Sequence, residues 1–163
     1  MIKPNLTLIA MGLLVLSACA TPKVRREPAD PDGPHYVRAN EPDPLPQMLK
    51  ETVLHFEFGE ANLTQHDAWK LKRLALQMKK QPWAAIRIAG HCDARGTEEY
   101  NLALGMKRAD TARNYLIRMG VPETAVEAIT FGEEVPLIDA DTDEAFAENR
   151  RAEFGPAPLE LFG

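Results

Sequence analysis

The sequence has few cysteines, few aromatic residues and no excess of basic charge. Its 163 residues include 2 cysteines, 7% aromatic residues, and 19 lysines and arginines against 24 aspartates and glutamates. Two cysteines cannot build a disulfide framework or a four-ligand zinc site, and the histidines show no metal-ligand spacing, so no metal or cofactor is expected. The formal charge of -5 offers no electrostatic footprint for nucleic acid. The length fits one globular domain and not two.

Long apolar runs are absent except near the amino terminus. Residues 6–18 are apolar apart from Thr7 and Ser17, and Lys3 is the only charge before position 23. A basic start followed by an apolar stretch is typical of a signal peptide. As a helix the run would span roughly 20 Å, against roughly 30 Å for the hydrocarbon core of a bilayer. We therefore predict that residues 1–18 are a signal peptide and not a membrane span.

The apolar run ends in Leu16-Ser17-Ala18-Cys19, which resembles the lipobox of bacterial lipoproteins. On this interpretation the mature chain begins at Cys19, which is lipidated and anchors the chain stably through several acyl chains. The residue after Cys19 is Ala20 and not an aspartate, which is the pattern of lipoproteins sent on to the outer membrane. We therefore expect an outer-membrane lipoprotein whose domain faces the periplasm. The alternative is a secretory signal cut near Ala18 or Ala20, with Cys19 incidental.

Residues 19–48 are rich in proline and in charge. Seven of the 13 prolines fall between Pro22 and Pro46, and no apolar period runs among them. Such a segment cannot bury a core, so we predict an extended, lipid-anchored linker. Its reach is at most roughly 90 Å, at about 3.1 Å per residue. The domain is expected to cover residues 49–155, and a loose tail residues 156–163.

Four segments of the domain show the apolar alternation of half-buried strands. They cover residues 52–58, 83–91, 127–132 and 151–154. In the first, Leu54, Phe56 and Phe58 share one face. Trp83 is interpreted as a core anchor at the start of the second. Pro156 cannot donate to a ladder and is expected to stop the last strand early.

Three segments carry helix signals. Thr64 caps a helix that ends at Pro82, Thr97 caps a second that ends at Gly120, and residues 142–149 form a short third. The alternating order predicts an α/β two-layer sandwich. Its mixed sheet has about four strands, with two long helices on one face and one short helix.

Polar residues concentrate in the loop after the second strand and in the helix that follows it. The loop reads G-H-C-D-A-R-G-T from residue 90, and spacings of three and four place Asn101, Leu104 and Arg108 on one helical face. An acid and an arginine so placed can bracket a zwitterion, Asp93 taking an ammonium and Arg108 a carboxylate bidentately. Spacing alone favours the simpler alternative, an internal ion pair between Asp93 and Arg108.

The segment G-H-C-D-A-R-G-T-E-E-Y-N-L-A-L-G-M-K-R-A, residues 90–109, resembles the peptidoglycan-associated lipoproteins (Pal), whose wall-binding part is an OmpA-like domain. The resemblance extends to L-H-F-E-F at residues 54–58 and N-R-R-A at residues 149–152. It implies a non-enzymatic domain of the OmpA-like fold. The resemblance further implies that this domain binds the diaminopimelate of the peptidoglycan stem peptide noncovalently, through Asp93 and Arg108.

The resemblance also implies a cellular role. A member of the Tol-Pal system tethers the outer membrane to the cell wall, supports envelope integrity and cell division, and has the periplasmic TolB protein as a partner. Three alternatives stay open. They are a wall-binding OmpA-like lipoprotein outside the Tol system, a peptidoglycan-modifying hydrolase that uses Cys92, and a motor-stator anchor, which the missing membrane span disfavours.

Further positions match the peptide-binding positions of this family or lie beside them. The residues assigned to binding on this ground are Phe58, Gly59, Thr97, Asn101, Leu104 and Arg150. The family usually has aspartate where Gly59 stands, so a carboxylate is missing there, and Glu57 or Glu60 is its possible substitute. Asn101 is expected mainly to tie the loop to the helix, and Arg151 to form a structural ion pair.

Catalysis is not expected. His91 and Cys92 are neighbours on a strand, and neighbours point to opposite faces, so a thiolate and imidazolium pair is disfavoured. Cys92 is predicted to be a small packing residue beside the loop.

Overall fold

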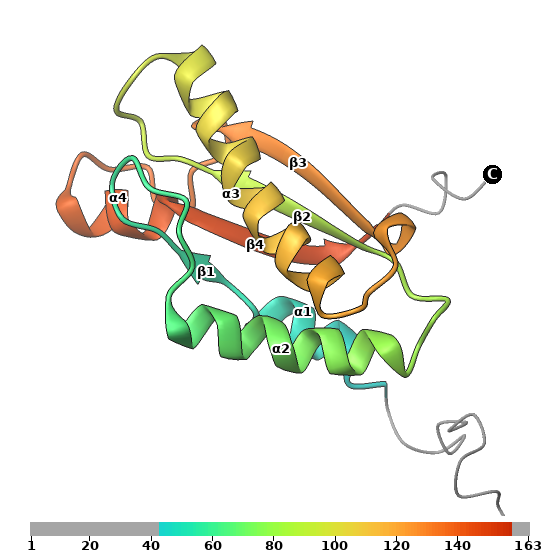
Figure 1. Ribbon diagram of the computed structural model, residues 1–163. Helices are drawn as coiled ribbons and strands as arrows, with labels where there is room; N and C mark the ends of the chain where they lie inside the picture. Colours follow the sequence, from blue (N-terminus) through green and yellow to red (C-terminus); the bar gives the residue numbers. More distant parts are fainter. Residues whose placement is uncertain (1–42, 158–163) are drawn as a thin grey trace, which may run out of the picture. The chain divides into compact units, whose positions relative to one another are not determined.

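The computed structural model describes residues 43–157 (Figure 1). Its helices are α1 (Leu45–Glu51), α2 (Gln65–Lys79), α3 (Glu98–Arg118) and α4 (Asp143–Asn149), with a 3-10 turn η1 (Glu123–Ala125). Its strands are β1 (Leu54–His55), β2 (Ile86–His91), β3 (Val126–Gly132) and β4 (Arg151–Pro156). The predicted signal peptide, Cys19, most of the linker and residues 158–163 lie outside the described residues. None of the described helices is long and apolar enough to cross a membrane.

The four strands form one mixed sheet in the order β1-β4-β2-β3. β2 pairs in parallel with β3, with Ile88 opposite Ala128, and antiparallel with β4, with Ile88 opposite Phe154. β1 pairs antiparallel with β4. Figure 1 shows α3 lying across β2 and β3, and α2 running below the sheet at a steep angle to α3. The predicted two-layer α/β sandwich is confirmed.

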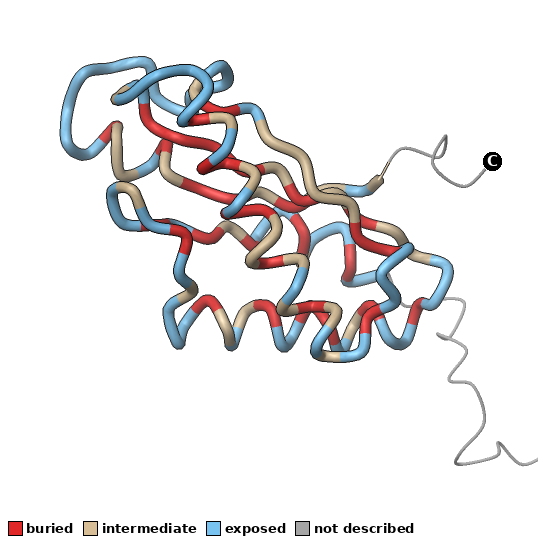
Figure 2. The backbone as a smooth tube through the Cα atoms, turned by 45° about the horizontal axis from the view of Figure 1, so that its top comes forward, coloured by how far each residue is buried: buried red, intermediate tan, exposed pale blue. Residues whose placement is uncertain are grey.

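The core lies between the sheet and the long helices, where the buried stretches of the chain face each other (Figure 2). Its fully buried side chains come from both layers: Leu54, Leu71, Leu74, Ile86, Ile88, Ala109, Ala112 and Leu116. Burying each of the larger ones contributes about 1.5–3 kcal/mol. The helical stripes predicted for α2 and α3 therefore face the sheet, as expected.

Hydrogen bonds at the helix starts confirm the predicted caps. The Thr64 hydroxyl accepts from the Asp67 backbone N at 3.1 Å, and the Asp67 carboxylate accepts from the Thr64 backbone N at 3.2 Å, which completes a capping box. Thr97 accepts from the Tyr100 backbone N at 3.2 Å and caps α3. These caps fix where each long helix begins.

Helix α1 begins inside the segment predicted as a linker. Leu45 and Leu49 are buried in the core, one turn apart, where α1 packs against α2 and β4. Asp43 supports this start, because its carboxylate accepts from the Leu45 backbone N at 2.9 Å and from Gln81 Nε2 at 2.5 Å. Two apolar residues among prolines show no period, and only tertiary packing makes this turn helical. The compact part thus begins before the predicted boundary at Leu49.

Strand β4 runs to Pro156, two residues beyond its predicted end. Gly155 lies opposite Arg87 and Pro156 opposite Ile86, and the Ala157 backbone N donates to the Ala85 carbonyl at 3.0 Å. Backbone N–H groups along a strand point alternately to its two sides, so the nitrogen of Pro156 points away from β2. On that other side β1 pairs only with residues 151 and 152, so no strand among the described residues lies opposite Pro156 there. No hydrogen bond is required of Pro156, so the prediction that it stops the strand early is wrong.

Two aromatic residues from the predicted strands are exposed. Trp83 is 74% exposed, because the chain turns after Pro82 and β2 begins only at Ile86. It is therefore not a core anchor. Phe58 is 60% exposed, because β1 ends at His55 and the alternation that buries Leu54 and Phe56 stops before it.

Candidate binding site

A small cavity lies where the loops after β1 and β2 meet α3. Its volume is about 10 Å³, which has room for a water molecule but not for an amino acid. Its lining residues are Phe58, Gly59, Cys92, Asp93, Arg95, Tyr100, Asn101, Leu104, Arg108 and Arg150. All residues predicted for binding line this cavity except Thr97, which is exposed and caps α3. Chain segments far apart in the sequence are thus brought together.

Asp93 is the acidic centre of the cavity. Its carboxylate is 4% exposed and accepts from Arg95 Nη2 at 2.6 Å, from the Arg95 backbone N at 3.2 Å and from Arg150 Nη1 at 3.1 Å. Burial alone would raise the pKa of Asp93, but the hydrogen bonds from Arg95 and Arg150 lower it below its ordinary value. Asp93 is therefore ionised at neutral pH.

Arg108 is fully buried and holds the two loops together. Its Nε donates to the Glu60 carbonyl at 2.9 Å, its Nη1 to the His91 carbonyl at 2.7 Å and to Cys92 Sγ at 3.4 Å, and its Nη2 to the Glu57 carbonyl at 3.2 Å. Burial lowers the pKa of Arg108, but a guanidinium remains charged at neutral pH.

The predicted pairing of Asp93 with Arg108 differs from the arrangement in the structure. Within residues 43–157 the two side chains line the same cavity but form no ion pair with each other, because each has other partners. Four of the five N–H groups of Arg108 are engaged. A bidentate contact with a ligand carboxylate would therefore require Arg108 to give up one of these partners, either a backbone carbonyl or the Cys92 sulfur.

Arg150 has donors to spare next to Asp93. Its Nε donates to the Phe56 carbonyl at 2.8 Å and its Nη1 to Asp93 at 3.1 Å. Its other three N–H groups have no partner among the described residues. Its neighbour Arg151 is buried and pairs with Glu153 at 2.6 Å, which confirms the predicted structural ion pair.

The loop of Phe58 and Gly59 forms the rim of the cavity. Gly59 has a φ of 67°, a left-handed conformation that glycine adopts without steric cost. The side chains of Glu57 and Glu60, considered as substitutes for the missing aspartate, line a neighbouring groove and not the cavity.

Asn101 and Leu104 complete the wall formed by α3. Asn101 Nδ2 lies 3.3 Å from both the Asp93 and Arg95 carbonyls and also donates to the Glu133 carboxylate. It therefore ties the loop to the helix, as expected. Leu104 packs with Ala61 and Cys92 in a small apolar cluster.

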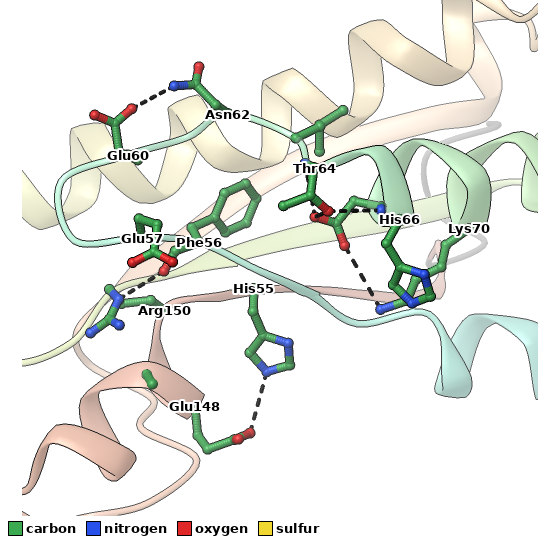
Figure 3. A pocket seen from close by; sticks show the side chains of 13 residues that line it. His55, Phe56, Glu57, Glu60, Asn62, Thr64, His66, Lys70, Glu148 and Arg150 are labelled. Atoms are coloured by element: carbon green, nitrogen blue, oxygen red, sulfur yellow. Dashed lines mark hydrogen bonds and ion pairs between the residues drawn. The ribbon is translucent and has the colours of Figure 1, made fainter.

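A groove of about 600 Å³ lies beside the cavity, and Arg150 borders both (Figure 3). Its walls come from β1, the loop after β1, the start of α2, and α4. Figure 3 shows His55 from β1 pointing toward Glu148 from α4, and His55 Nε2 lies 3.3 Å from the carboxylate. The groove is large enough for several amino-acid residues.

Two residues of the cavity wall, Arg95 and Tyr100, are missed by sequence reasoning. Both lie inside the segment that resembles the family, and Arg95 is only two residues from Asp93. This short spacing was the available signal. In a loop, however, sequence spacing does not determine the direction of a side chain. In a helix it does, and so the position of Arg108 could be predicted.

His91 and Cys92 do not form a catalytic pair. Burial raises the pKa of the Cys92 thiol, while burial and the charge of Arg151 lower the pKa of His91 to about 4, so both are uncharged at neutral pH. His91 instead stacks on Phe131, with ring centroids 5.3 Å apart. In residues 43–157 no group of three or more His, Cys, Asp or Glu side chains could hold a metal ion.

Replacement of Cys92 by serine should leave the fold and ligand binding intact. The Cys92 thiol donates to the Asn101 carbonyl at 3.3 Å and accepts from Arg108 at 3.4 Å, and a hydroxyl can form both bonds. We expect a stability loss of about 1 kcal/mol from the smaller apolar surface. Thermal melts and binding titrations check this. Loss of binding by a folded Cys92→Ser variant would contradict the packing role.

Acid should destabilise the domain through His91. In the unfolded chain its pKa is near 6.5 and in the folded chain about 4, so the unfolded state takes up the proton first as the pH falls. Stability is then complete above about pH 6.5 and declines by up to about 3 kcal/mol toward pH 4. In urea titrations His91→Phe should flatten this decline, while exposed His66→Gln should not. Equal slopes for all three proteins would contradict the role of His91.

Comparison with known proteins connects this fold and cavity to one group. Residues 55–150 match the OmpA family. The peptidoglycan-associated lipoprotein of Pasteurella multocida is 31% identical over 145 residues, 89% of this chain and 92% of that protein. The one from Brucella melitensis is 40% identical over 94 residues, but this match spans 57% of this chain and only 56% of that protein.

Solved structures agree with these relatives. The peptidoglycan-associated lipoprotein from Burkholderia pseudomallei is 35% identical, with a TM-score of 0.63 over 64% of this chain and 89% of that one. The C-terminal domain of Helicobacter pylori MotB has a TM-score of 0.58 over 67% of this chain and 87% of that one. At 22% identity it shows the fold alone.

A mixed four-stranded sheet covered by two long helices, with a charged cavity at the end of β2, defines an OmpA-like domain. The match covers more than half of the chain, from β1 to the residue before β4. The chain belongs to the OmpA family, and the relatives from Pasteurella multocida, Brucella melitensis and Burkholderia pseudomallei described above are peptidoglycan-associated lipoproteins.

Proposed function

We propose that the cavity around Asp93 binds the diaminopimelate of the peptidoglycan stem peptide without catalysis. The observation that carries this proposal is the convergence of Phe58, Asp93, Arg108 and Arg150 from separate parts of the chain on one cavity. Structural ion pairs alone would not require an exposed aromatic rim or an arginine with unpaired donors. The proposal is also supported by the names of the relatives, which are peptidoglycan-associated lipoproteins.

Diaminopimelate suits the charges of this cavity. Its side chain ends in an ammonium and a carboxylate. The ammonium binds the ionised Asp93, and the carboxylate binds the free N–H groups of Arg150 within the field of the buried Arg108. Each charge-assisted hydrogen bond contributes roughly 1.5–3 kcal/mol, enough for modest affinity. The rest of the stem peptide lies in the adjoining groove of about 600 Å³.

A pull-down with purified sacculi tests this function. The mature chain should sediment with diaminopimelate-containing walls and be released by soluble muropeptide, while walls that carry lysine in place of diaminopimelate should retain far less protein. Equal retention on both walls would contradict recognition of diaminopimelate. No retention on either would overturn wall binding itself.

The same proposal extends to the role in the cell. We infer an outer-membrane lipoprotein whose domain faces the periplasm and whose noncovalent grip tethers the membrane to the wall within the Tol-Pal system. TolB is the proposed protein partner, and envelope integrity and cell division are the processes supported. High local concentration near the wall compensates for modest affinity. Crosslinking in cells, followed by identification of the linked protein, tests the TolB contact.

The mature protein is expected to begin at acylated Cys19. The basis is Leu16-Ser17-Ala18-Cys19 at the end of an apolar run. Several acyl chains give stable anchoring, whereas one binds only marginally. Mass spectrometry of the N-terminal peptide should find Cys19 with a diacylglycerol and an acylated amine. An unmodified Cys19 would end the lipoprotein assignment while leaving wall binding possible.

A further inference from the structure

We propose that Arg95 is a built-in competitor that occupies the ligand position on Asp93 and determines which ligands enter the cavity. The proposal rests on the proposed function of this site. Its basis is that the cavity, at about 10 Å³, is too small for a ligand. Of the two arginines that pair with the Asp93 carboxylate, Arg95 is the more exposed one.

The contacts of Arg95 resemble those of a bound ligand. Its Nη2 lies 2.6 Å from Asp93 Oδ2, the same carboxylate that would receive the ligand ammonium. Its guanidinium carbon lies 4.3 Å from the ring centroid of Phe58 and 4.4 Å from that of Phe146, so two rings hold it. The guanidinium thus covers the rim of the cavity and satisfies its acid at the same time.

Arg95 is held less completely than the other two arginines. Its side chain is 39% exposed, against 13% for Arg150, while Arg108 is fully buried. The Nε of Arg95 is buried and has no hydrogen-bond partner among the described residues. A buried donor without a partner weakens the closed position. Arg95 is therefore the arginine that a ligand displaces, while Arg108 and Arg150 stay in place.

A second cavity provides a position for the displaced side chain. It has a volume of about 350 Å³, borders Cys92 and Phe146, and carries the acidic residues Glu133, Asp139 and Asp141. Phe146 is shared by this cavity and by the stack on Arg95, so a rotation of the Arg95 side chain past that ring would carry the guanidinium into the acidic cavity. The arginine keeps an acidic environment in both positions.

This arrangement makes the site selective for ligands that bring their own cation. A ligand with an ammonium replaces the Arg95 guanidinium on Asp93, so the carboxylate stays paired. A neutral ligand would leave Asp93 with Arg150 as its remaining charged partner among the described residues. Arg95 is thus a specificity-determining residue for diaminopimelate, whose side chain carries the required ammonium.

Titration of a diaminopimelate muropeptide into the mature protein and its variants tests the proposal. Arg95→Gln should bind about 5- to 20-fold more tightly than wild type, because nothing has to be displaced. Arg95→Lys should stay near wild type, since an ammonium still pairs with Asp93. Arg73→Gln is the matched control, because Arg73 also stacks on an aromatic ring, that of Trp69 at 4.9 Å, on helix α2. It should leave affinity unchanged.

The double variant Asp93→Asn with Arg95→Gln tests whether Arg95 affects affinity through its ion pair with Asp93. The gain from Arg95→Gln should disappear when Asp93 is already neutral, and a gain that persists would overturn the competition. Equal or weaker binding by Arg95→Gln would also overturn it. Absence of binding by wild type and Arg95→Gln alike would instead overturn the proposed function. A crystal structure of the complex should show Arg95 beyond about 4 Å from Asp93, the limit of an ion pair.

Discussion

Asp93→Asn is expected to weaken binding of a diaminopimelate muropeptide by about 2–4 kcal/mol, or about 30- to 1,000-fold. The substitution keeps the size of the side chain and removes the charge that the ligand ammonium would bind. Asp93 is the carboxylate of the cavity lining, and its depressed pKa keeps it ionised at neutral pH. Isothermal titration of the wild type and the variant measures the effect.

Asp110→Asn is a matched control for this prediction. Asp110 lies on α3, is half-buried and does not line the cavity. Its replacement by asparagine removes the same charge as Asp93→Asn but at a position outside the cavity. Its variant should bind like the wild type. Thermal melts should show both variants folded, because the hydrophobic core is untouched. Wild-type affinity in folded Asp93→Asn would remove Asp93 from the site.

Arg108 is a poorer probe of binding than its sequence spacing suggests. Its guanidinium bonds to the carbonyls of Glu57, Glu60 and His91, so truncation would leave the buried His91 carbonyl and two partly buried carbonyls without these donors. Each such group costs about 1–3 kcal/mol. We therefore expect the fold to survive replacement of Asp93 by asparagine but not truncation of Arg108. Arg150 is the better arginine to change.

Local sequence signals predict the parts of the fold that obey a regular period. The caps at Thr64 and Thr97 and the apolar stripe that contains Leu116 depend on helical spacing, and the structure has them where they were expected. Helix α1 shows the limit. Leu45 and Leu49 form a single apolar turn among prolines, and their burial depends on β4, which lies about a hundred residues later.

The candidate site could be located from sequence but its hydrogen bonds could not. Helical spacing places Asn101, Leu104 and Arg108 on one face, and the order of the elements brings that face to the loop after β2. The partners of each charge depend on loop side chains, whose directions no period determines. Arg95 therefore takes the position on Asp93 that spacing suggested for Arg108.

Gly90→Ala is expected to destabilise the domain by about 3–5 kcal/mol. β2 and α3 approach so closely that a Cβ at Gly90 would lie 1.9 Å from the carbonyl oxygen of Gly105 and 2.7 Å from its carbonyl carbon. Both atoms belong to the backbone of α3 and cannot rotate away. The helix would have to move off the sheet, and this would separate Arg108 on α3 from Asp93 in the loop after β2. Affinity should therefore fall with stability.

Gly155→Ala separates this steric effect from the general effect of adding a methyl group to a strand. Gly155 lies in β4 opposite Arg87 of β2, and a Cβ there would have no atom within 4 Å among the described residues. Its stability should change by less than about 1 kcal/mol. Urea denaturation of the two variants and the wild type, with muropeptide binding measured on each folded protein, decides the matter. Equal stability of Gly90→Ala and Gly155→Ala would contradict the close approach of β2 and α3, and with it the rigid support that this packing gives to the Asp93 cavity.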